Sequence, residues 1–391
     1  MPVVPITDLQ LKNKKVLVRC DFNVPIAEGK IQDTSRIDAS LETIRYILEH
    51  GGSAVLCSHL GRPKERTPEL SLKPVAEYLS NVLAQKVRLA PDCVGDHTGK
   101  LVDALKPGEA LLLENLRFHK EEEANDRDFS HELARHKHAY VNDGFGTAHR
   151  AHASTVGVTR FLAERAAGFL MMRELEALRA VTENPKRPSV AIMGGAKVSD
   201  KIELIRNLLG KVDAILIGGA MAYTFLKAQG IEVGRSRVED DKLDLAKALL
   251  AEAASKGVKI VLPTDHVVAG APEESATPHT VTDIPSEMMG LDIGPNTAAA
   301  FIAQIAQANT VVWNGPLGVF EVPAFAEGTR RVGEALANQA NVVSIIGGGD
   351  TASALAHQPW AGKFTHISTG GGATLEFLEG RELPGVKALE A

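Results

Sequence analysis

Cysteine is scarce in this chain, which has only Cys20, Cys57 and Cys93 among 391 residues. Three is an odd number, and no two of them have a C-x-x-C spacing. The sequence therefore excludes a disulfide framework and gives no sign of a cysteine-bound zinc site. Because such a set of thiols suits a reducing compartment, we expect a cytoplasmic protein.

Long apolar runs and an excess of positive charge are also missing. No uninterrupted hydrophobic stretch approaches the ~18 residues of a membrane span, and the first residues lack a basic segment followed by an apolar core. The formal net charge is -6, which disfavours nucleic acid and anionic membranes as partners. We expect neither export nor a membrane partner nor a nucleic-acid partner.

The chain does have enough apolar residues for two cores. Hydrophobic residues make up 44% and charged residues 24% of a sequence that is long for a single core. Short apolar runs alternate with helical patterns such as 37–50 and 72–83, which is typical of parallel sheets covered by helices. We predict an α/β protein with two doubly wound, Rossmann-like parallel-sheet domains, joined by a helix over 171–182.

In the first half, basic side chains follow four predicted strands, over 15–20, 54–57, 110–113 and 139–141. Ligands of open parallel sheets lie beyond the carboxyl ends of the strands, and the arginine fork pairs with carboxylate and phosphate groups. Any one of these arginines alone fits an ordinary surface position, but four loops share the feature. We predict a crevice for a small polyanion bearing a hydroxyl, formed by Asp21, Asn23, Arg36, His59, Arg62, Arg117 and Arg150.

His149 and His152 flank Arg150 at a spacing that fits one face of a helix. No carboxylate or cysteine stands beside them in the sequence, so we favour structural or anion-contacting histidines over metal ligands.

The stretch 189–209 predicts a strand, a tight turn and a helix. Its apolar run breaks at Gly194 and Gly195 and gives way to apolar residues at helical spacing. Lys197 would then lie at the helix N-terminus with Lys201 one turn further on the same face, both within reach of a phosphate. An ordinary strand-to-helix turn with a solvated lysine remains the alternative, since neither a G-x-x-x-x-G-K-[ST] nor a G-x-G-x-x-G motif occurs.

In the second half, glycine follows the predicted strands, which end near Ile217, Trp313, Ile346 and Ser368. Glycine lets backbone N–H groups approach a phosphate closely, although one such turn alone is common in α/β proteins. Asp350 comes directly after three glycines, where it is placed to hold a Mg²⁺ ion that bridges phosphates, and Glu321 is placed to bind a ribose hydroxyl. We predict a nucleotide site.

A nucleophile and its base are absent as a motif, because no G-x-S-x-G elbow occurs. One site for a polyanion and one for a nucleoside phosphate suggest phosphoryl transfer between the two ligands. If the acceptor is a carboxylate, ionised above pH ~4, no general base is needed. Catalysis then depends on positioning and charge neutralisation.

Eight motifs in this order resemble those of the phosphoglycerate kinase family: D-F-N-V-P, S-H-L-G-R-P, E-N-L-R-F-H, G-T-A-H-R-A-H-A-S, G-G-A-K-V-S-D-K-I, V-W-N-G-P-L-G-V-F-E, G-G-G-D-T and S-T-G-G-G-A. They extend over nearly the whole chain. The resemblance implies a hinge-bending, monomeric enzyme that transfers a phosphoryl group between ATP and the carboxylate of 3-phosphoglycerate with Mg²⁺ as cofactor.

The resemblance also assigns roles to individual residues. It implies that the seven residues of the predicted crevice bind 3-phosphoglycerate and that Asp350 holds Mg²⁺. The residues it implies for catalysis are Arg36, Lys197, Lys201 and Gly371. Those it implies for nucleotide binding are Gly195, Ala196, Lys197, Lys201, Gly218, Gly219, Asn314, Glu321, Gly348, Gly349, Asp350 and Thr351. Ala220 stands where many relatives have a third glycine, which leaves the adenine pocket open.

The expected domains are 1–170 for 3-phosphoglycerate, 171–185 as a hinge helix, 186–380 for the nucleotide, and 381–391 returning to the first domain. We expect closure of the hinge when both ligands are bound. A catalytically silent nucleotide-binding sensor or scaffold would not need both Arg36 and Lys197. An oxidoreductase would need the dinucleotide fingerprint, which is absent.

Overall fold

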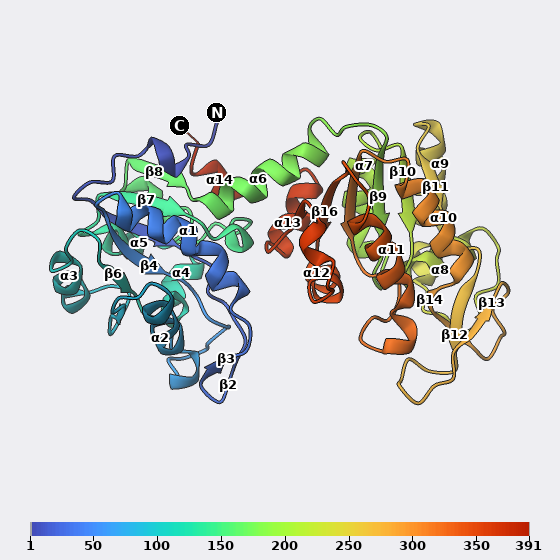
Figure 1. Cartoon of the computed structure of the whole chain (residues 1–391), viewed down its shortest axis with the longest axis horizontal. Helices are drawn as coiled ribbons and strands as arrows, with labels where there is room; N and C mark the ends of the chain where they lie inside the picture. Colours follow the sequence, from blue (N-terminus) through green and yellow to red (C-terminus); the bar gives the residue numbers. More distant parts are fainter. Residues whose placement is uncertain (1, 391) are drawn as a thin grey trace. The chain divides into compact units, whose positions relative to one another are not determined.

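The computed structural model describes residues 2–390 of the chain and divides it into two compact units (Figure 1). The first unit runs to Leu175 and takes in the C-terminal segment from Glu382, and the second is Glu176–Arg381. The division at Leu175 falls inside helix α6 (Phe169–Thr182), which extends the predicted connecting helix by two residues at its start.

The first unit is built on a six-stranded sheet in the order β5-β6-β4-β1-β7-β8, with every neighbouring pair parallel. A small hairpin, β2 and β3, lies outside it. The strands are β1 (Lys15–Arg19), β2 (Ile26–Ala27), β3 (Lys30–Ile31), β4 (Ser53–Cys57), β5 (Arg88–Leu89), β6 (Ala110–Leu112), β7 (Ala139–Asn142) and β8 (Glu164–Ala167). The helices besides α6 are α1 (Ser35–Glu49), α2 (Lys73–Val82), α3 (Asp96–Asp103), α4 (Lys120–Glu123), α5 (Arg127–Ala134) and α14 (Pro384–Lys387).

The core of the first unit follows from the two-residue period of its strands. Val16 and Val18 of β1 and Leu56 of β4 lie on one sheet face and pack with Ile37 and Ile44 of α1. The central strands are buried on both faces because helices cover both, which is why they read as nearly continuous apolar runs.

The second unit repeats this plan with a parallel sheet in the order β11-β10-β9-β15-β16-β17. Its strands are β9 (Ser189–Met193), β10 (Ala214–Ile217), β11 (Lys259–Val261), β15 (Thr310–Asn314), β16 (Val343–Gly347) and β17 (His366–Ile367). Its helices are α7 (Ile202–Leu208), α8 (Met221–Ala228), α9 (Leu243–Ser255), α10 (Pro295–Ile305), α11 (Glu327–Ala337), α12 (Gly349–Leu355) and α13 (Gly372–Leu378). The fold class predicted from the sequence is thus confirmed.

A second, antiparallel sheet in this unit is not predicted from the sequence. It has the order β13-β12-β14, with strands β12 (His266–Ala269), β13 (His279–Val281) and β14 (Met289–Ile293). Within residues 2–390, none of the helices combines the length and apolar character needed to cross a bilayer.

Candidate functional site

The polar side chains predicted for an anion follow four neighbouring strands of the first sheet. β6, β4, β1 and β7 are adjacent and parallel, so their carboxyl ends lie along the same sheet edge. His59 follows β4, Arg117 follows β6, and Arg150 lies in the loop after β7. The fold therefore brings together residues that are far apart in the sequence.

Arg36 lies in the first turn of α1, whose start is fixed by Asp33, since Ser35 N–H donates to Asp33 Oδ1 at 2.8 Å. Its Nη1 atom lies 3.3 Å from Asp21 Oδ2 and 3.2 Å from the carbonyl oxygen of Asn23. The two acceptors hold the guanidinium beside the loop after β1. Asp21 therefore accepts a hydrogen bond from Arg36. The sequence predicts only a contact of Asp21 with a hydroxyl group of the ligand.

Arg117 is positioned by the residue two places before it. The Asn115 side chain accepts from Leu60 N–H at 3.1 Å and donates to the carbonyl oxygens of Leu60 and Leu70, which ties the neighbouring loop to this one. Asn115 also accepts from Arg117 N–H at 3.1 Å, which begins the short 3₁₀ turn Leu116–Phe118. Arg117 Nη1 then donates to the carbonyl oxygen of Gly61 at 2.7 Å.

Three of the other predicted residues are Asn23, Arg62 and Arg150. Asn23 Oδ1 accepts from the N–H of Gly61 at 2.9 Å, and Arg62 follows as an exposed side chain. Arg150 Nε lies 3.2 Å from His149 Nε2.

The pKa values of His59 and His152 show that the arginine side chains of this sheet edge create a common positive field. Burial lowers the pKa of His59 well below its usual value, and the charges of Arg19, Arg117 and Arg36 lower it further. Burial, followed by the charges of Arg19, Arg117 and Arg150, lowers the pKa of His152 to about 4. Both imidazoles are therefore neutral at pH 7 inside a strongly positive field, which favours an anionic ligand.

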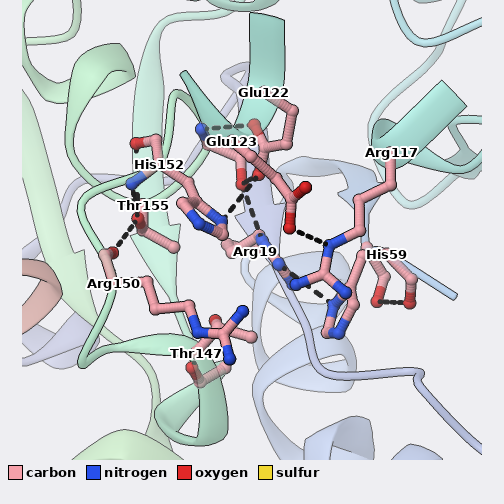
Figure 2. Close-up of polar contacts among 12 residues, drawn as sticks. Arg19, His59, Arg117, Glu122, Glu123, Thr147, Arg150, His152 and Thr155 are labelled. Atoms are coloured by element: carbon pink, nitrogen blue, oxygen red, sulfur yellow. Dashed lines mark hydrogen bonds and ion pairs between the residues drawn. The ribbon is translucent and has the colours of Figure 1, made fainter. Parts of the chain in front are cut away.

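Two residues of this region, Arg19 and Glu122, are not among those predicted from the sequence (Figure 2). Arg19 is 1% exposed and Glu122 0% exposed. A charged residue at the end of the apolar run K-V-L-V-R is the signal that reveals Arg19, because a buried charge requires a partner. Glu122 has no such signal, since the run K-E-E-E reads as a solvated face.

In the second unit, the turn after β9 corrects the prediction for Lys197. The helix does not start there: residues 194–198 form an irregular loop, Ser199–Lys201 form a 3₁₀ turn, and α7 starts at Ile202. Val198 is fully buried, and Ser199 is held by Glu239 through its N–H at 3.1 Å and its hydroxyl at 2.5 Å. These two anchors delay the helix, so the two lysines do not share one helix face.

Lys197 and Lys201 nevertheless line the same cavity, of about 580 Å³. Lys197 is exposed, whereas the Lys201 ammonium donates to Asn314 Oδ1, and burial lowers the pKa of Lys201. Other predicted residues that line this cavity are Gly195, Ala196, Asn314, Gly348, Gly349, Asp350, Thr351 and Gly371.

The cavity depends on a close approach of two loops at the ends of β9 and β15. A Cβ atom on Gly194 would lie 2.0 Å from the carbonyl oxygen of Pro316. Gly315 N–H donates to Thr351 Oγ1 at 2.7 Å, which joins the first turn of α12 to these loops. Gly371 has φ +52°, a left-handed conformation that favours glycine.

A neighbouring cavity of about 420 Å³ shares Gly195, Ala196, Pro316 and Asp350 with the first. Gly219 and Glu321 line it, as predicted residues, together with Tyr223, Leu291 and other apolar side chains that are not predicted from the sequence. The pair of cavities offers a polar end and an apolar end, as a nucleotide requires.

Gly218 lies outside both cavity linings. Its N–H donates to the carbonyl oxygen of Met193 at 2.8 Å, and a Cβ atom there would lie 2.6 Å from Leu317. Its observed role is therefore to let β10 end close to the Leu317 loop.

A third group, Asp92, Cys93 and His119, brings three possible ligand atoms within 4.8 Å of one another. Asp92 Oδ1 is 2.7 Å from His119 Nε2, and its Oδ2 is 3.6 Å from Arg66 Nη1. Asp92 Oδ1 also accepts from Cys93 N–H at 2.7 Å. The carboxylate thus already has three partners, and the guanidinium disfavours a cation at this place.

Comparisons with known proteins match nearly the whole chain. The family model for phosphoglycerate kinase matches residues 6–381. The chain is 55% identical to a phosphoglycerate kinase of Koribacter versatilis, covering 100% of this chain and 99% of that one, and 54% identical to one of Clostridium novyi, covering 98% of each. The solved phosphoglycerate kinase of Coxiella burnetii has a TM-score of 0.91 at 43% identity, covering 99% of both chains, and that of Pyrococcus horikoshii has 0.86 at 33%, covering 99% of this chain and 98% of that one. Because these matches run the length of the sequence, the chain belongs to the phosphoglycerate kinase family.

Proposed function

We propose that this chain catalyses reversible phosphoryl transfer between ATP and the carboxylate of 3-phosphoglycerate, giving ADP and 1,3-bisphosphoglycerate. It is a kinase with a carboxyl group as acceptor, and its place is in glycolysis. The observation that carries the proposal is the group of arginines and neutral histidines at the sheet edge of the first unit, which suits a small anion with two charged ends.

The anion site binds 3-phosphoglycerate through Asp21, Asn23, Arg36, His59, Arg62, Arg117 and Arg150. Arg36 also faces the group that is transferred. In support, Arg36 is fixed by Asp21 and Asn23, and Arg117 is fixed by Gly61. Fixed guanidinium groups need little reorganisation when charge develops in the transition state.

The nucleotide binds with its phosphates in the cavity of Lys197 and Lys201 and its base in the neighbouring apolar cavity. Gly371 N–H and Lys197 contact the phosphoryl group in transfer. Asp350 lines both cavities, and its carboxylate suits a hard cation with oxygen ligands. It would hold Mg²⁺, which neutralises phosphate charge when bound.

The transfer step needs no general base. A carboxylate oxygen of 3-phosphoglycerate forms a bond to the γ-phosphorus, and the bond from that phosphorus to the bridging oxygen breaks. The electron pair leaves on the β-phosphate of ADP, and no proton moves, since the acceptor is ionised above pH ~4. The residues act by orientation and by charge neutralisation.

Each substrate has its site in a different unit, so we propose residues 171–185 as the hinge that lets both bound substrates meet. Small-angle scattering with no ligand, with each ligand and with both checks this: we expect compaction only with both. Equal compactness in all four states contradicts closure. A monomeric state and a cytoplasmic location belong to the same proposal.

The activity is tested by ATP- and Mg²⁺-dependent phosphorylation of 3-phosphoglycerate, coupled to NADH oxidation. We expect turnover in the wild type and a loss of ~10³-fold in Arg36→Ala and in Lys197→Ala. Arg88→Ala and Lys247→Ala, at exposed positions outside both sites, serve as controls. A folded wild type that binds ATP without turnover would support the catalytically silent sensor instead.

A further inference from the structure

Two adjacent carboxylates of the short helix α4 face two different arginines, Arg117 of the anion site and Arg19 beside it (Figure 2). Glu122 connects to Arg19 through the Ser154 hydroxyl, and Glu123 lies beside Arg117. Neither carboxylate is among the residues that bind either substrate under the proposed function.

The inner carboxylate, Glu122, has both oxygens occupied by Ser154. Oε1 accepts from the Ser154 hydroxyl at 2.5 Å, and Oε2 accepts from the Ser154 N–H at 2.9 Å. Because this hydroxyl donates its only proton to Glu122, it presents a lone pair to Arg19, whose Nε donates to it at 2.8 Å. The Glu122 charge thus fixes the orientation of the guanidinium.

Arg19 in turn fixes His59. The Nη2 atom of Arg19 lies 3.3 Å from His59 Nδ1, and a guanidinium only donates hydrogen bonds. His59 Nδ1 must therefore accept, which places the ring proton on Nε2. The chain of contacts from Glu122 keeps His59 as a neutral imidazole that can donate Nε2–H to an anion.

The outer carboxylate, Glu123, acts on Arg117. Its Oε1 atom lies 3.2 Å from Arg117 Nε, while Arg117 Nη1 donates to the carbonyl oxygen of Gly61 at 2.7 Å. The Arg117 side chain is 7% exposed and that of Glu123 is 52% exposed. The ion pair at Nε, which is not a hydrogen bond, and the hydrogen bond from Nη1 engage two of the three guanidinium nitrogens and leave Nη2 for a ligand.

We propose that Glu122 and Glu123 are positioning residues for 3-phosphoglycerate, which act through Arg19 with His59 and through Arg117. This rests on the proposed function. A carboxylate that acted only by its field would weaken anion binding, so removing its charge would lower the KM for 3-phosphoglycerate. Removal of a positioning residue changes KM in the opposite direction: the KM for 3-phosphoglycerate rises.

The experiment compares Glu123→Gln with Glu121→Gln in the coupled assay, measuring KM for both substrates. Glu121 belongs to the same helix and loses the same charge, but it contacts neither arginine through any hydrogen bond or ion pair observed within residues 2–390. We expect Glu123→Gln to raise the KM for 3-phosphoglycerate about tenfold, with the KM for ATP and the melting temperature unchanged. Glu121→Gln should match the wild type.

An unchanged KM in Glu123→Gln, or an equal decrease in both variants, overturns the positioning role of Glu123. A wild type without turnover instead contradicts the proposed function, so the two failures are distinguishable.

Glu122→Gln tests the inner contact, because it replaces one of the two oxygens that accept from Ser154 with an NH₂ group, which cannot accept. The ¹⁵N chemical shifts of the His59 ring report the tautomer directly. We expect the Nε2–H form in the wild type and in Glu121→Gln, and its loss together with a raised KM for 3-phosphoglycerate in Glu122→Gln. An unchanged tautomer in a folded Glu122→Gln overturns the inner part. If that variant does not fold, an Nδ1–H tautomer of His59 in the wild type still overturns the positioning role of Glu122.

Discussion

His119 and His152 show how individual surroundings decide the charge of a residue in this protein. His119 Nε2 donates a hydrogen bond to Asp92 Oδ1 at 2.7 Å, which raises the pKa of His119, whereas burial among arginines lowers the pKa of His152 to about 4. His119 therefore contributes stability below the unfolded value of ~6.5 that is lost as the pH rises through its folded pKa.

His152 gives the opposite pH dependence. Between pH ~6.5 and about 4 the unfolded chain binds a proton at this position that the folded chain does not, so stability falls as the pH falls through this window. We expect His152→Gln to reduce this fall by ~3 kcal/mol, measured by urea unfolding at a series of pH values. Parallel pH profiles for the two proteins would contradict the depressed pKa.

The charged residues also show which parts of the site can be predicted from the sequence. His59, Arg117 and Arg150 could be predicted because each lies in the loop after an apolar run, and Arg36 because it comes a short connection after the first run. Glu122 could not, because burial of one glutamate in a run of three depends on Ser154, which is 32 residues away in the sequence and meets it only in the fold.

The loops at the ends of β9 and β15 approach so closely that one position requires glycine. Gly194 must lack a side chain, since a Cβ atom there would lie 2.0 Å from the Pro316 carbonyl oxygen and 2.5 Å from that of Gly315. The backbone, not a flexible side chain, would have to shift.

We expect Gly194→Ala to lower the free energy of unfolding by about 1–3 kcal/mol and to weaken ATP binding. Urea unfolding and calorimetric titration of ATP measure the two effects. Gly210→Ala, where a Cβ atom meets nothing within 4 Å, is the matched control and should change neither. A variant that binds ATP as tightly as the wild type would show that the loops tolerate separation.

The sequence predicts the parallel strands better than the antiparallel ones, even though β14 is mostly buried. The central parallel strands are apolar on both faces and were recognised with boundaries within one or two residues. The antiparallel sheet was not, because β13 is short and mostly exposed and a bulge interrupts β12 between Val267 and Val268. The helix start after β9 was wrong because Glu239, 40 residues further on, holds Ser199.

At the scale of the whole molecule, the first unit is discontinuous in sequence. The C-terminal segment completes it: Leu383 and Leu389 are buried, Gly385 N–H donates to the carbonyl oxygen of Ala148 at 2.8 Å, and Glu390 forms a bridge with Val3. Figure 1 shows α14 in red on the blue and green unit. Ala148 lies two residues before Arg150, so this contact also supports the anion site.

Truncation after Arg381 should therefore destabilise the first unit selectively, by about 2 kcal/mol for each buried leucine. Both tryptophans, Trp313 and Trp360, lie in the second unit and report on it alone. We expect the truncated chain to unfold by circular dichroism below the wild-type temperature while its tryptophan fluorescence transition stays in place. A common shift of both signals would contradict separate units.

The discontinuity has a consequence for biosynthesis. A ribosome adds residues in the N-to-C direction, so all of the second unit, Glu176–Arg381, is made between the two segments of the first. The unit whose synthesis starts first is therefore completed only after the second unit has been made, and its apolar surface around Val3 and Ala148 stays uncovered during that interval.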